Sequence, residues 1–138
     1  LHISAALIIA GTIIRVASYR HLGRFFTLQL AIRDGHKLVK DGPYRVVRHP
    51  AYTGGLLALL GDLCYQLGPA SIWAQLGLWQ SIPACIFGIT KICLAAYINV
   101  VALMLRVNEE DRVLREQFRG EWEAWARQTQ YKLVPFVY

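Results

Sequence analysis

The sequence predicts an all-α, multi-pass transmembrane helical bundle. Hydrophobic residues make up 55% of the 138 residues and charged residues only 17%, so the chain is more apolar than a typical soluble domain. The charges are also segregated, because residues 3–14 and 92–105 contain none whereas 15–49 and 106–132 hold most of them. Apolar blocks with charged connections are typical of integral membrane proteins, and the length fits one domain, residues 1–138.

The formal net charge of +6 raises the question of nucleic-acid binding. The basic residues flank the apolar blocks, as the positive-inside pattern requires, so we expect no nucleic acid as partner. The first residue is Leu1 rather than Met, which indicates a fragment or a processed chain. Residues 2–18 lack a basic leading segment, which favours the end of a transmembrane helix over a signal peptide. We therefore expect the domain to be truncated at its N-terminus.

Three apolar blocks are predicted to cross the membrane: residues 3–16, 51–67 and 82–105. The third is long enough for a hydrocarbon core of about 30 Å. Between the second and third blocks, Trp73 and Trp79 favour a membrane interface. Gly54 and Gly55 would let the second helix pack closely against a neighbour.

The third block carries a polar stripe. Its members lie within about 100° of one helix face, and they are Lys91, Asn99, Arg106 and Glu110. Lipid does not solvate such groups, so we expect the stripe to face the protein interior or a wet cavity. The alternative is that Lys91 marks a break between two shorter helices.

A C-terminal amphipathic helix is expected after the third block. One apolar stripe comprises Val107, Leu114, Phe118, Trp122 and Trp125. The other face interleaves charges, with Asp111 and Arg115, and Arg112 and Glu116, spaced for i,i+4 pairing. This pattern predicts a helix on the membrane surface or against the protein, followed by a tail, residues 131–138, that folds back.

Two polar blocks remain as candidates for chemistry: GHKLVKDGPYRVVRHPAY, residues 35–52, and RVNEED, residues 106–111. We find no nucleophile motif and expect no metal site. Gly42 and Pro43 favour a turn, and Pro50 suits the first turn of a helix whose free N–H groups would attract a carboxylate or phosphate. The plain alternative is a capped membrane helix with a basic flank. Two crossings between Pro50 and Arg106 would place both blocks on one face, which the basic excess marks as cytoplasmic.

These two blocks, with the terminal LVPF, resemble the isoprenylcysteine carboxyl methyltransferases from about Gln29 to Phe136. The resemblance implies methyl transfer from S-adenosyl-L-methionine to the C-terminal carboxylate of a prenylated cysteine in CaaX-type proteins. It implies a helical bundle in the endoplasmic reticulum membrane with a cytosol-facing cofactor pocket. The implied cofactor residues are Gln29, His36, Lys37, Leu38, Val39, Tyr44, His49, Pro50, Ala51, Tyr52 and Glu110. Arg106 is the implied substrate residue, and Arg106 and Glu110 are the implied catalytic pair.

The implied chemistry needs no general base, because a carboxylate with a pKa of about 3.5 is already ionised at pH 7. The enzyme must align the reacting atoms and exclude water. Arg106 suits the acceptor carboxylate and Glu110 the cofactor's ammonium group. His49 or backbone N–H groups would meet the cofactor's carboxylate, with Tyr44 and Tyr52 near the adenine or sulfonium. The prenyl chain would lie between helices open to membrane lipid.

Three alternatives stay open. A related membrane methyltransferase would act on a phospholipid amine or another small acceptor, although Arg106 would repel an amine. A steroid-type membrane reductase would need a nicotinamide cofactor. A non-catalytic membrane adaptor would need neither His49 nor Glu110. Residues 68–81 have no clear counterpart in the resemblance, and the connection from Pro50 to Arg106 is longer than the family leads us to expect.

Overall fold

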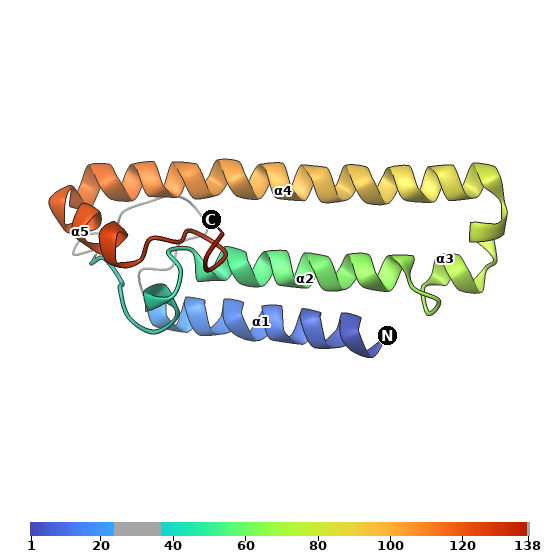
Figure 1. Cartoon of the computed structure of the whole chain (residues 1–138), viewed down its shortest axis with the longest axis horizontal. Helices are drawn as coiled ribbons and strands as arrows, with labels where there is room; N and C mark the ends of the chain where they lie inside the picture. The colour runs from blue at the N-terminus through green and yellow to red at the C-terminus, as the bar shows by residue number, and fades with distance from the viewer. Residues whose placement is uncertain (24–36, 138) are drawn as a thin grey trace.

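The computed structural model describes residues 1–23 and 37–137, and all regular structure within them is helical. The elements in order are α1 (His2–Leu22), η2 (Gly42–Arg45), α2 (Pro50–Leu67), α3 (Ile72–Gln75), η3 (Leu78–Gln80), α4 (Ile82–Phe118) and α5 (Gly120–Gln128). Figure 1 shows α1 beside α2, with α4 running the length of the molecule along α2. The chain turns at α5, and the C-terminal tail returns toward the start of α2. The predicted all-α class is confirmed.

Glycines allow α1 and α2 to touch backbone to backbone. A Cβ atom added to Gly11 would lie 2.4 Å from the carbonyl oxygen of Gly54, and one added to Gly54 would lie 2.5 Å from that of Gly11. A Cβ atom on Gly61 would come within 2.8 Å of the Ser4 carbonyl oxygen. Small residues at such crossings are how helices associate in lipid. The prediction of close packing at Gly54 is confirmed.

Two helices in the described ranges, α1 and α4, are long and apolar enough to cross a membrane. The large apolar side chains of α4 are exposed along its length, among them Ile86, Phe87 and Leu94, as lipid-facing side chains would be. α2 forms where the second span is predicted, but it is not among these candidates. Polar residues such as Asp62 and Gln66, which hydrogen-bond to each other at 2.6 Å, interrupt its apolar surface. Its crossing stays a prediction.

The third predicted span and the amphipathic helix are arranged differently from the expectation. α4 is continuous through Lys91 and beyond Leu105 to Phe118, so the alternative of a break at Lys91 is wrong. The expected single amphipathic helix is also wrong. Its first part belongs to α4, which ends where Arg119 takes a φ of 43°, and its second part is α5. The apolar spacing continues across this turn, which is why the sequence pattern concealed it.

The polar stripe of α4 does not face one interior among the described residues. Asn99 is exposed and its side-chain amide donates to the Ala95 carbonyl oxygen of its own helix at 2.8 Å. The ammonium group of Lys91 lies 5.7 Å from the Trp73 ring centroid. Neither group therefore needs an interior partner, because backbone and aromatic contacts already accommodate it. Only the Arg106–Glu110 end of the stripe meets α2.

We predict that Gly54→Ala destabilises the protein. The new Cβ atom would meet backbone, which cannot move aside as a flexible side chain can, and overpacking of this kind costs about 1–3 kcal/mol. Unfolding in detergent measures the loss. Gly120→Ala is the matched control, because nothing lies within 4 Å of its Cβ position, and equal losses in both variants would contradict the proposed helix contact.

Candidate functional site

The two polar blocks meet where the start of α2 approaches the last part of α4. The Tyr52 hydroxyl donates to Glu110 Oε1 at 2.5 Å. Arg106 Nε in turn donates to the Tyr52 hydroxyl oxygen at 2.9 Å and lies 3.6 Å from Glu110 Oε1. Tyr52 thus joins the guanidinium and the carboxylate, and we call these three residues the Tyr52 bridge. The prediction that the two blocks lie together is confirmed.

His49 lies next to this bridge, just before the first residue of α2. Its Nε2 is 2.9 Å from Asp111 Oδ1 and its Nδ1 is 3.4 Å from Glu110 Oε2. The side chain is buried, so both ring nitrogens are held by carboxylates away from solvent. Pro50 explains the position of His49, because the residue before a proline is driven out of helical conformation. The imidazole ring of His49 can therefore point across to α4.

The environment of His49 raises its pKa. Burial alone disfavours the charged imidazolium, but the hydrogen bonds to Asp111 and Glu110 and their negative charges outweigh that cost, so the pKa lies above its usual value. A raised pKa of this kind stabilises the fold below the ordinary histidine value of about 6.5. The stabilisation is then lost as the pH rises through the folded-state pKa.

The C-terminal tail holds the backbone around His49. The backbone N–H groups of Arg48 and His49 each donate at 2.9 Å, to the carbonyl oxygens of Tyr131 and Lys132 respectively. The Thr53 hydroxyl donates to the Leu133 carbonyl oxygen at 2.6 Å, and Leu133 is 1% exposed. The prediction of a tail that folds back is confirmed, and its role is to fix the approach to α2.

Tyr44 connects this cluster to a second group of predicted residues. Its ring is buried with Trp122 and Trp125, and Leu38 and Val39 pack against that aromatic group. Burial, and after it the charge of Glu110, raises the pKa of Tyr44, so its hydroxyl keeps its proton. Tyr44 therefore belongs to the aromatic group against which Leu38 and Val39 pack, and its hydroxyl is also subject to the charge of Glu110.

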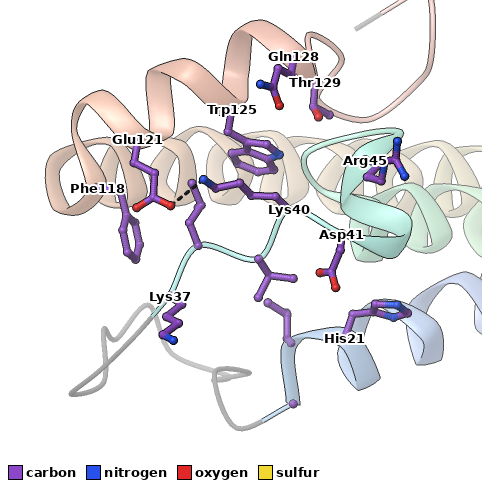
Figure 2. A pocket seen from close by; sticks show the side chains of 14 residues that line it. His21, Lys37, Lys40, Asp41, Arg45, Phe118, Glu121, Trp125, Gln128 and Thr129 are labelled. Atoms are coloured by element: carbon purple, nitrogen blue, oxygen red, sulfur yellow. Dashed lines mark ion pairs between the residues drawn. The ribbon is translucent and has the colours of Figure 1, made fainter.

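A cavity of about 1130 Å³ lies between the end of α1, residues 37–41 and the turn from α4 into α5. Lys37, Leu38 and Val39 line it, together with Phe118 and Trp125. Figure 2 shows Lys40 reaching Glu121 beside Trp125, an ion pair of 2.6 Å that links the segment to α5. The cavity offers apolar and aromatic walls with charged groups at its edge.

The predicted cofactor residues therefore form two groups. Lys37, Leu38 and Val39 line the large cavity, whereas His49, Tyr52 and Glu110 do not. Pro50 is buried as the first residue of α2, and the Ala51 carbonyl oxygen accepts from Arg15 Nη1 at 3.5 Å. Gln29 and His36 lie outside the described residues. Within residues 1–23 and 37–137, no group of three or more potential metal-binding side chains occurs.

Sequence reasoning missed the role of Asp111. The i,i+4 spacing suggested pairing with Arg115, but Asp111 pairs with His49, Arg48 and Lys132, and Arg115 pairs with Glu123 at 3.0 Å. The expected Arg112–Glu116 pair is confirmed at 2.9 Å. The signal in the sequence was the acidic run NEED, residues 108–111. Two of its adjacent carboxylates, Glu110 and Asp111, both turn toward His49, which simple pairing on a helix surface would not require.

Comparison with known proteins gives a consistent family. A sequence model of the isoprenylcysteine carboxyl methyltransferase (ICMT) family matches residues 4–81. A probable protein-S-isoprenylcysteine O-methyltransferase of Oryza sativa subsp. indica is 28% identical over 139 residues, covering 99% of this chain and 61% of the rice protein. Uncharacterized protein YpbQ of Bacillus subtilis (strain 168) is 28% identical over 112 residues, covering 81% of this chain and 55% of YpbQ.

A shorter match is stronger in identity. Protein-S-isoprenylcysteine O-methyltransferase B of Arabidopsis thaliana is 39% identical over 67 residues, which are 47% of this chain and 34% of the plant protein. No solved structure matches. The chain thus spans 61% of the length of the rice relative. The family match and the two candidate spans, α1 and α4, indicate an integral membrane protein.

We predict that Asp111→Asn lowers the pKa of His49, because the variant removes the charge that most directly favours the imidazolium. Histidine NMR shifts followed against pH measure the change. The stability difference between the wild-type protein and the variant should be greatest below the ordinary histidine pKa of about 6.5 and shrink as the pH rises through the raised folded-state pKa. Asp41→Asn, at an exposed carboxylate, is the control and should leave the His49 titration unchanged.

Proposed function

We propose that this chain, which belongs to the isoprenylcysteine carboxyl methyltransferase family, transfers a methyl group from S-adenosyl-L-methionine to the C-terminal carboxylate of a prenylated cysteine. The observation that carries the proposal is the Tyr52 bridge. It places a guanidinium beside a carboxylate at the end of a candidate membrane span. A methyl acceptor with a carboxylate and a methyl donor with an ammonium group need these opposite charges.

The large cavity suits the proposed donor. Its volume of about 1130 Å³ is slightly larger than that of typical ligand pockets, which run from roughly 300 to 1,000 Å³. Phe118 and Trp125 offer aromatic faces for a purine, and Leu38 and Val39 offer apolar contact. The fit supports a nucleoside with an amino-acid tail that extends past Tyr44 toward Glu110. Gln29 and His36 are proposed to complete the pocket on the strength of the family resemblance.

S-adenosyl-L-methionine would supply a methyl group on a sulfonium, so that a carboxylate oxygen forms the new C–O bond as the C–S bond breaks. The residues of the chain bind and orient. Arg106, whose side chain is 44% exposed, would hold the acceptor carboxylate. Glu110 would hold the donor's ammonium group, and His49, whose two ring nitrogens lie against Glu110 and Asp111, would position the Glu110 carboxylate. Tyr52 keeps Arg106 and Glu110 at a fixed separation.

The membrane setting follows from the same proposal. The prenyl chain would lie against the exposed apolar surface of α4, because burying an apolar tail of this size in lipid and helix avoids a large hydration cost. We propose that α2 also crosses the membrane, and that the site faces the cytosol at the endoplasmic reticulum, where it would meet CaaX-type proteins. The tail contacts at residues 48–53 support one domain over residues 1–138.

The direct test is methyl transfer by the purified chain in detergent. Labelled S-adenosyl-L-methionine should methylate a farnesylated cysteine analogue that carries a free carboxylate, and a carboxamide analogue should receive nothing. Donor binding without transfer to the acid would overturn the assignment and direct the search to a phospholipid amine or a small thiol. Binding of NADPH but not of S-adenosylhomocysteine would instead favour a reductase.

We expect Arg106→Ala to impair use of the acceptor more than binding of the donor. Loss of a charge-assisted contact should lower kcat/KM for the farnesylated analogue about 10- to 100-fold. Calorimetry with S-adenosylhomocysteine should give a nearly unchanged Kd. Arg127→Ala removes an exposed arginine of α5 and should alter neither value. Equal loss of donor and acceptor binding in Arg106→Ala would count against a separate acceptor role.

The reverse pattern is expected for Glu110→Gln. Removing the carboxylate charge should weaken donor binding about tenfold in calorimetry, since one charge-assisted hydrogen bond is worth about 1.5–3 kcal/mol. The matched control is Glu109→Gln, one residue away, whose side chain pairs with Arg112 on the helix surface. If both variants bind the methyl donor as tightly as the wild-type protein does, Glu110 does not contribute to binding of the methyl donor.

A further inference from the structure

A second cavity, of about 560 Å³, lies on another side of α4. Asn108, Asp111 and Arg115 of α4 line it, whereas Arg106 and Glu110 do not. At about 100° per residue, Arg115 lies roughly opposite Arg106 around the helix. Trp122 of α5 and Lys132 of the tail complete its lining. It is therefore separate from both the Tyr52 bridge and the large cavity.

Arg48 is the buried cation of this cavity. Its side chain is 10% exposed, and its Nε has no hydrogen-bond partner among the described residues. The carboxylate paired with it is Asp111, whose Oδ2 lies 3.9 Å from the guanidinium, beyond hydrogen-bond distance. A buried guanidinium with an unused donor costs free energy unless an anion completes its shell.

Asp111 cannot supply that anion alone. Its Oδ1 is engaged by His49 at 2.9 Å, and its Oδ2 is 3.8 Å from Lys132 Nζ as well as 3.9 Å from Arg48. One carboxylate thus faces three basic groups. The second lining carboxylate, Glu116, shares Arg112 with Glu109, and Arg115 pairs with Glu123 at 3.0 Å. The lining as a whole carries four basic side chains, Arg48, Arg112, Arg115 and Lys132, against two carboxylates.

Trp122 orients the guanidinium groups. The guanidinium carbon of Arg48 lies 5.4 Å from the Trp122 ring centroid, and that of Arg115 lies 5.8 Å from it. Contact with an aromatic face holds a guanidinium in place without using its N–H groups. Two arginines thus lie against one indole ring, and holding guanidinium groups in place beforehand reduces the ordering cost of binding an oxyanion.

We propose that this cavity, between Arg48, Lys132 and Arg115, binds a phosphate oxyanion such as an anionic phospholipid headgroup presents. The uncharged stretch of α4 ends at Arg106, and the cavity begins within the next turn, at the depth of the headgroup layer. Guanidinium groups match the geometry of phosphate oxygens, and basic pockets at this level bind lipid headgroups. The proposal does not depend on methyl transfer, because neither the proposed donor nor its acceptor carries a phosphate.

The test has one arm for each source of phosphate. In the first, inorganic phosphate is titrated into the full chain in detergent at constant ionic strength, with chloride as the reference anion, and calorimetry gives the Kd. In the second, the unfolding temperature is compared between nanodiscs of phosphatidylcholine alone and nanodiscs that also contain phosphatidylglycerol. Both arms are run on the wild-type protein, Arg48→Gln, Lys132→Gln and the matched control Arg127→Gln, whose arginine lies outside the cavity.

We expect binding to weaken about tenfold or more in Arg48→Gln and Lys132→Gln, and to be unchanged in Arg127→Gln. A response to phosphatidylglycerol alone assigns the site to a lipid headgroup, and a response to phosphate alone assigns it to a free anion. No response of the wild-type protein in either arm overturns the proposal, as does an equal loss in Arg127→Gln. If Arg48→Gln fails to fold, Lys132→Gln at the more exposed edge decides the question.

Discussion

The position of α4 depends on the junction that His49 and Tyr52 make with Glu110 and Asp111. α1 and α2 are joined by direct backbone contact at Gly11 and Gly54, which needs no charged group. The side-chain hydrogen bonds between α2 or its N-cap and α4 in the described structure all lie at one end, through His49 and Tyr52. These partners are largely withdrawn from water. Removing one of them would leave a buried polar or charged group without its partner, and the free-energy cost of that is larger than the net stabilisation that the pair provides.

The sequence predicted the features that local chemistry determines. Pro50 begins α2 where a proline favours a helix start, and glycines mark the α1–α2 contact. The meeting of the two polar blocks followed from topology, since both must lie on one membrane face. The turn at Arg119 was hidden because the apolar spacing runs through it. The choice of His49 over Arg115 as the partner of Asp111 depends on where the folded-back tail places the backbone, and no local pattern contains that information.

Tyr44 gives the site its organisation. The family resemblance implied one cofactor pocket, whereas the structure shows an aromatic-lined cavity and a separate charged cluster, and Tyr44 packs with Trp125 of the cavity wall while the charge of Glu110 acts on its hydroxyl. An elongated ligand with a flat end and a charged end would use both. The arginines on Trp122 lie on the far side of the same aromatic group. The buried aromatic residues of α5 thus contribute to both cavities, Trp125 to the large one and Trp122 to the second.

The tail contact has a consequence for how the protein is made. The Leu133 carbonyl oxygen that accepts the hydrogen bond from the Thr53 hydroxyl lies 80 residues further along the chain. At a synthesis rate of about 5–20 residues per second, the ribosome needs roughly 4–16 s to cover that distance. During this interval α1 and α2 can pair through their glycines while the backbone at Arg48 and His49 still lacks its partners. The helix pair can therefore form before the charged cluster is assembled.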